Sequence, residues 1–189
     1  MNNCKIAGFG TIAAGEYDIV NISGTGKTTG DIKASDISIS GIGKFNGNVE
    51  ADFISSSGTA NFEKNVNCKT FKSSGFVRIL ENLNADSITA TGCIKVCNDL
   101  NTDKLYIICS GSGCSFKNIY GDDIYIDSKK EITKAEEIEA TTIKVKNVNA
   151  HKISGEKIEI LGKSIVEIVE YSDSITISEN CKIKQIIKL

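Results

Sequence analysis

A regular spacing of glycines limits what this chain can fold into more than any other feature of the sequence. Five glycines that each follow Ser or Thr lie 17 residues apart: Gly24, Gly41, Gly58, Gly75 and Gly92. A fixed period of this length is the signature of a repeat architecture, in which each repeat is one supersecondary unit that stacks on its neighbours. The period therefore decides how every other motif is interpreted.

Apolar residues recur at three positions within each 17-residue repeat. They form three columns: Val20, Ile37, Ile54, Phe71 and Ile88; then Thr28, Phe45, Phe62, Ile79 and Val96; then Ile32, Val49, Val66, Leu83 and Leu100. Short strands of this kind cannot bury their apolar faces alone, so successive turns must stack. We predict an all-β chain with three strands per turn, wound into a three-sided parallel β-helix (β-solenoid) whose columns become internal ladders.

Two further columns predict the corners of each turn. Small residues follow the third strand and suit a tight corner: Ala34, Ala51, Cys68 and Ala85. Asp or Asn fills the other column: Asp31, Asn48, Asn65, Asn82 and Asp99. Such side chains favour corners and can bond one another between stacked turns. We interpret this second column as structural rather than as a ligand site.

The period changes in the second half of the chain, which divides a single solenoid domain over 1–189 into three parts. Coils of 17 residues span about 18–102. An irregular coil follows over about 103–137, with a loop or bulge near "CSGSGC" and a charged segment, "DSKKEITKAEE". Apolar residues then recur every five positions, as Ile138, Ile143, Val148, Ile153 and Ile158. This spacing predicts slimmer coils of about 15 residues over 138–189, and about ten coils in all.

Composition and charge exclude several classes of protein. The chain lacks Pro and Trp, and its 22 basic and 24 acidic residues are interspersed, so we expect no nucleic-acid partner. No apolar run approaches the roughly 18 residues of a membrane span, and the start "MNNCKIAGFG" lacks the pattern of a secretory signal. These features disfavour an exported adhesin. We expect a cytoplasmic protein whose seven cysteines stay reduced.

The stretch "NISGTGKTTGD" resembles a phosphate-binding loop, because Gly26, Lys27 and Thr28 fit the last three positions of that motif. The next coil repeats the phrase as "SISGIGKFNGN", with Phe45 in place of Thr28. The Gly, Lys and Thr therefore occupy repeat positions, and Lys27 is expected to point outward. We predict no nucleotide and no other cofactor.

Three groups of residues could carry chemistry. The pairs Cys93 with Cys97 and Cys109 with Cys114 have spacings that suggest zinc, although free thiols are the simpler interpretation. The second group is the single histidine, His151, as a general base, and the third is Asp122, Asp123 and Asp127 as acids or calcium ligands. His151 lacks an orienting partner in the sequence, and the chain has short turns and few aromatic residues for a sugar platform. We predict no catalytic and no metal-binding residues.

The repeated "SG-x-G-K…G-[DN]-[IV]-x-A" and the later "IKVKNVNAHKISGEKIEIL" and "VEYSDSITISENCKI" resemble the bactofilins, in their longer Gram-positive form. The resemblance covers nearly the whole chain. It implies a right-handed β-helix that polymerises end to end without nucleotide. It also implies a bacterial cytoskeletal scaffold for cell shape, cell-wall synthesis or motility, with cell-envelope proteins as partners. The family's membrane-targeting start, Met-Phe, has no counterpart in "MNNCKIAG", so membrane attachment is left open.

Self-association follows from the residues as well, because each end of a β-solenoid presents unpaired backbone and apolar side chains unless a cap covers it. No cap is evident in the sequence at the carboxyl-terminal end, and the amino-terminal end is expected to begin with an incomplete first turn. The residues expected to mediate the contact are Ile6, Phe9 and Ile12 at one end and Ile183, Ile186, Ile187 and Leu189 at the other. We therefore predict a scaffold that assembles into filaments or closed oligomers and is not an enzyme. The alternative is a β-helix enzyme acting on carbohydrate or acyl groups.

Overall fold

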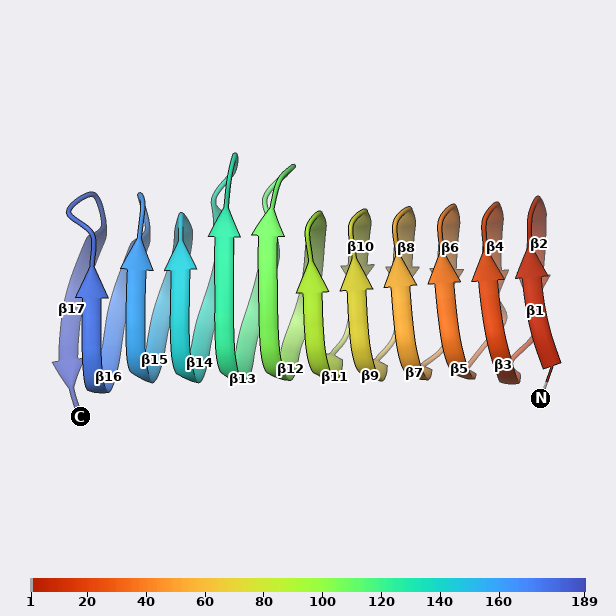
Figure 1. Ribbon diagram of the computed structural model, residues 1–189, viewed down its shortest axis with the longest axis horizontal. Coiled ribbons are helices and arrows are strands. Elements are labelled where there is room, and N and C mark those ends of the chain that lie inside the picture. Colours follow the sequence, from red (N-terminus) through yellow and green to blue (C-terminus); the bar gives the residue numbers. More distant parts are fainter. Residues whose placement is uncertain (1) are drawn as a thin grey trace.

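The computed structural model describes residues 2–189, which form a rod of stacked coils without a helix (Figure 1). Every strand pairing within the rod is parallel, and the chain makes about 11 turns from one end to the other. The predicted parallel β-solenoid is thus confirmed. The count exceeds the ten coils expected because residues 2–12 already form most of a turn.

Two strands, rather than the predicted three, make up each turn of the first half. Long and short strands alternate: β1 Asn2–Ile6, β2 Phe9–Ile12, β3 Gly15–Ile22, β4 Thr25–Thr28, β5 Ile32–Ile39, β6 Ile42–Phe45, β7 Val49–Ser56, β8 Thr59–Phe62, β9 Val66–Ser73, β10 Phe76–Ile79 and β11 Leu83–Ala90. Each long strand covers two sides of the coil and bends between them. In β5 the bend falls at Ser35, which has no register partner although Ala34 and Asp36 do. A small inward residue before the bend leaves room for the chain to turn without breaking the ladder.

The three predicted columns all lie in the interior, together with further columns that the sequence did not predict, such as Ile22 with Ile39 and Ala60 with Val77 and Ile94. Val20 pairs with Ile37 and Ile37 with Ile54, so like positions lie directly above one another. Every residue of the three columns is at most 2% exposed. In the second column Phe45 and Phe62 stack, with ring centroids 4.7 Å apart. Since burying one Ile or Phe side chain contributes about 1.5–3 kcal/mol, these columns supply much of the stability of the rod.

The glycine column marks the corner between long and short strands, where the backbones of successive coils nearly touch. A Cβ atom added to Gly58 would lie 2.0 Å from the carbonyl oxygen of Gly41, and one added to Gly75 would lie 2.0 Å from that of Gly58. None of these glycines has a positive φ. The corner therefore requires glycine for space rather than for conformational freedom.

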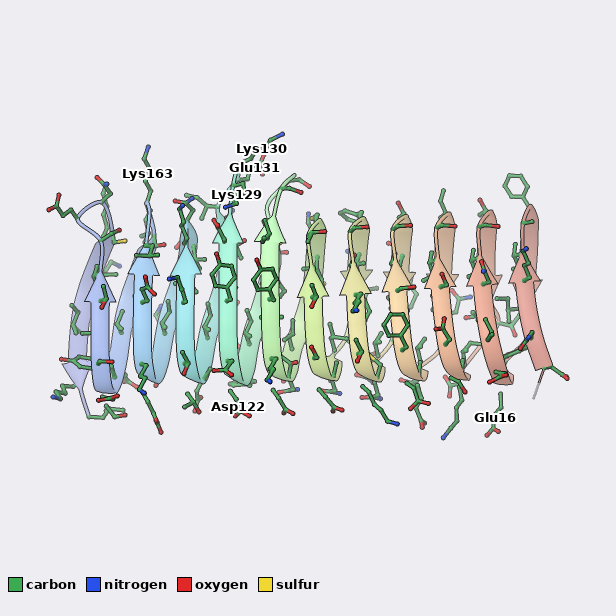
Figure 2. All side chains as sticks on the ribbon, in the orientation of Figure 1. Glu16, Asp122, Lys129, Lys130, Glu131 and Lys163 are labelled. Carbon is green, nitrogen blue, oxygen red and sulfur yellow. A yellow bond between two sulfur atoms is a disulfide. The ribbon has the colours of Figure 1, made fainter. Side chains whose placement is uncertain are left out.

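The second half is built from longer strands: β12 Cys93–Cys109, β13 Ser115–Ser128, β14 Thr133–Lys146, β15 Val148–Leu161, β16 Ile165–Ile177 and β17 Lys182–Lys188. The expected loop lies at 110–114, and most of the charged "DSKKEITKAEE" is strand, with only 129–132 left as a loop. Both loops project from one edge of the rod, where Figure 2 shows Lys129, Lys130 and Glu131.

Coil length varies more in the second half than the sequence predicted. More residues separate Ile119 from its register partner Ile138 than separate Ile138 from its own partner Ile153. The next coils lengthen again, as the pairs Ile153 with Val169 and Val166 with Ile183 show. The coil length predicted over 138–189 is therefore present at one step only. A register shift between Gly155 and Lys157, and a turn at Gly162 with φ of 69°, account for the added residues.

Candidate self-association site at the ends of the solenoid

Strands inside the rod pair along both edges, whereas the terminal strands pair along one. Within the described residues, β1 pairs only with β3, β2 only with β4, and β17 only with β16. Each end therefore presents a row of backbone groups that can pair with another chain. The two ends of the rod differ, however, in how well they cover their apolar side chains.

The amino-terminal end buries most of its inward residues. Ile6 is 7% and Ile12 is 1% exposed. Ile6 folds over Gly10, since its Cδ1 atom would lie 3.1 Å from a Cβ at that position. Tyr17 packs against the core, and its hydroxyl donates to the carbonyl of Ala13 at 2.9 Å. Phe9 is 93% exposed but belongs to an outward column beside Thr25, not to the end surface.

The carboxyl-terminal end leaves its core columns uncovered. Ile186 pairs with Val169, which is fully buried, yet Ile186 is itself 50% exposed because no further coil lies over it. Ile183 continues the column of Val166 and is only partly buried. Leu189 is 71% exposed and lies just beyond β17, where its backbone N–H donates to the carbonyl of Tyr171 at 2.9 Å, so it contributes less to the apolar end surface than Ile183 and Ile186 do. Ile187 pairs with Glu170 in an outward column and contributes less to the end.

Sequence reasoning missed two residues of this end. Ile175 and Ile177, in the second half of β16, pair with the buried Ile158 and Ile160 and have no strand over them. Both are partly buried and contact the core. The alternation in "SITIS" is the available signal, but it does not show that this strand lies at the end, because the chain continues to Leu189. The last residues form β17, which covers only the first half of β16.

Charged side chains hold the edge of the carboxyl-terminal coil to the coil beneath it. Lys184 Nζ lies 2.7 Å from Glu167 Oε1, and His151 Nδ1 lies 3.0 Å from the other oxygen of that carboxylate. The hydrogen bond from Lys184, with a smaller effect of His151, lowers the pKa of Glu167. His151 therefore has a charged partner on an exposed face, which suits surface pairing.

Most other sequence candidates lie apart on the rod. Lys27 is exposed and Thr28 is buried in the strand β4, as the repeat predicted. Asp127 is buried and bonds to Lys129, whereas Asp122 is exposed on the opposite edge (Figure 2). In the described part of the chain, no group of three or more His, Cys, Asp or Glu residues could hold a metal ion. Nor does any helix there have the length and apolarity needed to cross a bilayer.

The expectation that every cysteine is a free thiol is wrong for one pair. Cys109 and Cys114 form a disulfide that closes the loop between β12 and β13, because the short "SGSG" segment brings their Cα atoms within 6.3 Å. Cys93 lies beneath this loop, with its sulfur 3.7 Å from the carbonyl oxygen of Gly113. Burial raises the pKa of the Cys68 thiol to about 12. Cys97 is the exposed thiol of the set.

The low aromatic content predicted no aromatic platform on the surface, yet two tyrosines stack there. Tyr106 and Tyr125, paired in register on β12 and β13, have ring centroids 4.9 Å apart. Identical residues at one position of adjacent coils are brought to this distance by the ladder itself. The fold therefore accounts for the pair.

The chain is similar in sequence to no protein-family model and to no curated protein, and it matches no solved structure. Its assignment to the parallel β-solenoids therefore rests on its own parallel strand pairings, which join each coil to the next from β1 to β17. The candidate site likewise rests on its own geometry: a rod with one covered end and one open end.

Proposed function

We propose that the protein is a structural scaffold of the cytoskeletal kind, which assembles end to end without nucleotide into filaments or closed oligomers. The observation that carries this proposal is the open carboxyl-terminal end. There Ile183 and Ile186 continue buried columns but have no coil above them. The end of another rod would bury these apolar side chains and form hydrogen bonds with the backbone edge of β17, just as neighbouring coils do inside the rod.

Physical reasoning favours the end over other surfaces for this contact. Exposed apolar groups of a β-solenoid end are normally capped in monomeric proteins. An uncapped edge strand is a template for pairing with another chain. The resemblance of the repeats to the bactofilins supports the same role, and with it a place in cell shape, cell-wall synthesis or motility. The proposed assembly needs no nucleotide, because the segment "SGTGKT", which resembles a phosphate-binding loop, is part of an ordinary coil of the rod.

Electron microscopy and light scattering of the purified protein, without nucleotide, test the proposal. We expect filaments or closed oligomers from the natural chain and monomers from Ile186→Asp, because a carboxylate at the end surface would have to be buried. Ile132→Asp is the matched control, since Ile132 is 39% exposed in the loop before β14. It should assemble as the natural chain does. A monodisperse monomer of the natural chain at high concentration would contradict the proposal.

A further inference from the structure

One outer face of the rod carries a column of basic side chains. The outward residues of β2, β4, β6, β8 and β10 continue in register through β12 to β17. We call this column the basic face: Thr11, Lys27, Lys44, Asn61, Arg78, Lys95, Ser115, Lys134, Asn149, Ile165 and Lys182. Six of these residues are Lys or Arg and none is acidic. Charges that are interspersed along the sequence are thus gathered by the fold.

Most of these cations lack a partner. Within residues 2–189, only Lys44 of the basic face forms an ion pair, with Glu63 at 3.1 Å. Lys95 lies over the ring of Phe76 instead, with its nitrogen 5.9 Å from the ring centre. By contrast, lysines on other faces commonly pair between adjacent coils, as Lys33 does with Glu50 at 2.6 Å. The basic face therefore presents uncompensated charge in a chain whose net charge is -2.

The compensating charge lies on one corner of the same rod. The bend of each long strand displays a residue without a register partner. We call these residues, two of which lie in β16, the bend corner: Asp18, Ser35, Asp52, Lys69, Asp86, Asp103, Asp122, Thr141, Glu156, Ser172 and Asp173. Seven are acidic and one is basic. Of the acids, only Asp52 and Asp173 form ion pairs within the described chain, with Lys69 and Lys157.

The basic face and the bend corner lie on opposite sides of the rod. Each turn consists of a short strand and two halves of a long strand, and the bend corner lies between those halves. The corner is therefore opposite the third side, which carries the basic face. Figure 2 shows Asp122 projecting from the lower edge, the edge that also holds Glu16. Both features repeat once per coil, at the roughly 4.8 Å spacing of parallel strands.

We propose that rods associate side by side, with the bend corner of one copy on the basic face of the next. The complementary charges, the shared spacing and the opposite placement together favour a second copy as the occupant. The contact is heterologous because the two surfaces differ, and it does not close into a ring because they lie on opposite sides of the rod, so it generates open arrays of parallel rods. It goes beyond the end-to-end assembly proposed above and does not depend on it.

The contact should be weak for one pair of rods and strong for many. An exposed ion pair contributes little on its own, and salt screens it beyond about 8 Å at physiological ionic strength. Rods already joined into a filament present many such contacts at once, which raises the overall affinity without any new interaction. Lateral association should therefore depend on salt, whereas apolar contacts between ends should not.

Charge-reversal variants test this arrangement. The face variant carries Lys27→Glu, Arg78→Glu and Lys134→Glu. The corner variant carries Asp86→Lys, Asp103→Lys and Asp122→Lys. Bundle width is measured by electron microscopy and turbidity at low and high sodium chloride. We expect the natural chain to form bundles that high salt disperses into single filaments. Each variant alone should remain unbundled at low salt, and one chain carrying all six changes should bundle again.

Two controls separate this contact from a general effect of net charge and from assembly through the ends. Lys130→Glu, Lys146→Glu and Lys163→Glu change the net charge by the same amount as the face variant but lie outside the basic face, so bundling should persist. The Ile186→Asp variant, which should be monomeric at physiological salt, should form short side-by-side oligomers only at low salt, because that change leaves both lateral surfaces intact.

Three results would overturn the inference. The first is that the natural chain forms no bundles, or forms bundles that high salt does not disperse. The second is a folded six-fold variant that fails to bundle. The third is binding to phosphatidylserine vesicles that the face variant abolishes while self-association stays unchanged, because the basic face would then serve an anionic lipid surface.

Discussion

At the scale of single residues, the repeat dictates which side chains are allowed, and the reason is visible in the distances between coils. The glycine column could be predicted from its 17-residue spacing, but its cause could not. Glycine is often needed at a corner because it tolerates a positive φ, whereas these corners have no positive φ and no room for a side chain. The distance between stacked backbones becomes known only when the coils are superposed.

Replacing Gly58 by Ala should lower the free energy of unfolding of the rod by about 1–3 kcal/mol or more, the usual cost of overpacking. The new methyl group would lie 2.0 Å from the Gly41 carbonyl oxygen, and a backbone atom cannot move aside as a flexible side chain would. Urea unfolding followed by circular dichroism measures the loss. Gly111→Ala is the matched control, since nothing lies within 4 Å of the added methyl group there. Equal stability of the two variants would show that the close approach of the backbones is not the cause.

The thiol of Cys68 should make the protein sensitive to alkaline pH. Its pKa rises to about 12 in the folded rod, chiefly through burial, while an unfolded thiol titrates near 8.5. The folded state then holds the proton more tightly, so stability is intact below about pH 8.5 and falls as pH rises toward 12. Cys68→Ala, which matches Ala51 and Ala85 in the same column, should lose less stability between pH 8.5 and 10.5 than the natural chain. Parallel pH profiles of the two proteins would show that Cys68 has no part in the loss.

At the scale of strands and ladders, the sequence predicted columns better than it predicted strand boundaries. The apolar columns and the Asp/Asn column fall where the period placed them, because a ladder requires only that each coil repeat the last. The sequence did not predict that two strands would join into one long strand. They join because hydrogen bonding between coils continues around the bend, where the inward residue is small, as at Ala34. The longer coils that follow β15 were missed because short insertions at turns leave the apolar spacing on each side unchanged.

The Asn ladder should stabilise the rod through bonds between coils. Asn65 Nδ2 donates to Asn48 Oδ1 at 3.2 Å, and its own Oδ1 accepts from the backbone and side chain of Asn82 at 3.2 and 3.0 Å. Asn65→Ala should cost about 1–3 kcal/mol, because it leaves groups of the partly buried Asn82 without their acceptor. Asn61→Ala, on the outward face of the same coil, should change the free energy of unfolding by less than about 0.5 kcal/mol. Urea titrations of both variants make the comparison, and similar losses would show that the ladder contributes nothing.

At the scale of the whole molecule, self-association through an end was predictable from the uncapped apolar residues, but the asymmetry of the ends was not. The sequence treats Ile6 and Ile186 alike, as apolar residues near a terminus. The structure separates them, because Ile6 is covered within its own coil and Ile186 is 50% exposed. The residues that cover an end are determined by how the terminal strands fold back. A repeat pattern in the sequence does not predict this.

This asymmetry predicts where assembly protects the backbone from hydrogen exchange. A solenoid is held by contacts between neighbouring coils, so its terminal coils should open most readily. Assembly should slow exchange most in β17 and in residues 172–177 of β16, whose outer edges are free in the single rod. Mass spectrometry of the natural assembly against the Ile186→Asp monomer gives the difference for each segment. Added protection in β1 and β2 as well would show that the open end meets the covered end of the next rod, whereas protection confined to β16 and β17 would show that two open ends meet. Unchanged exchange in β17 would exclude this end from the contact altogether.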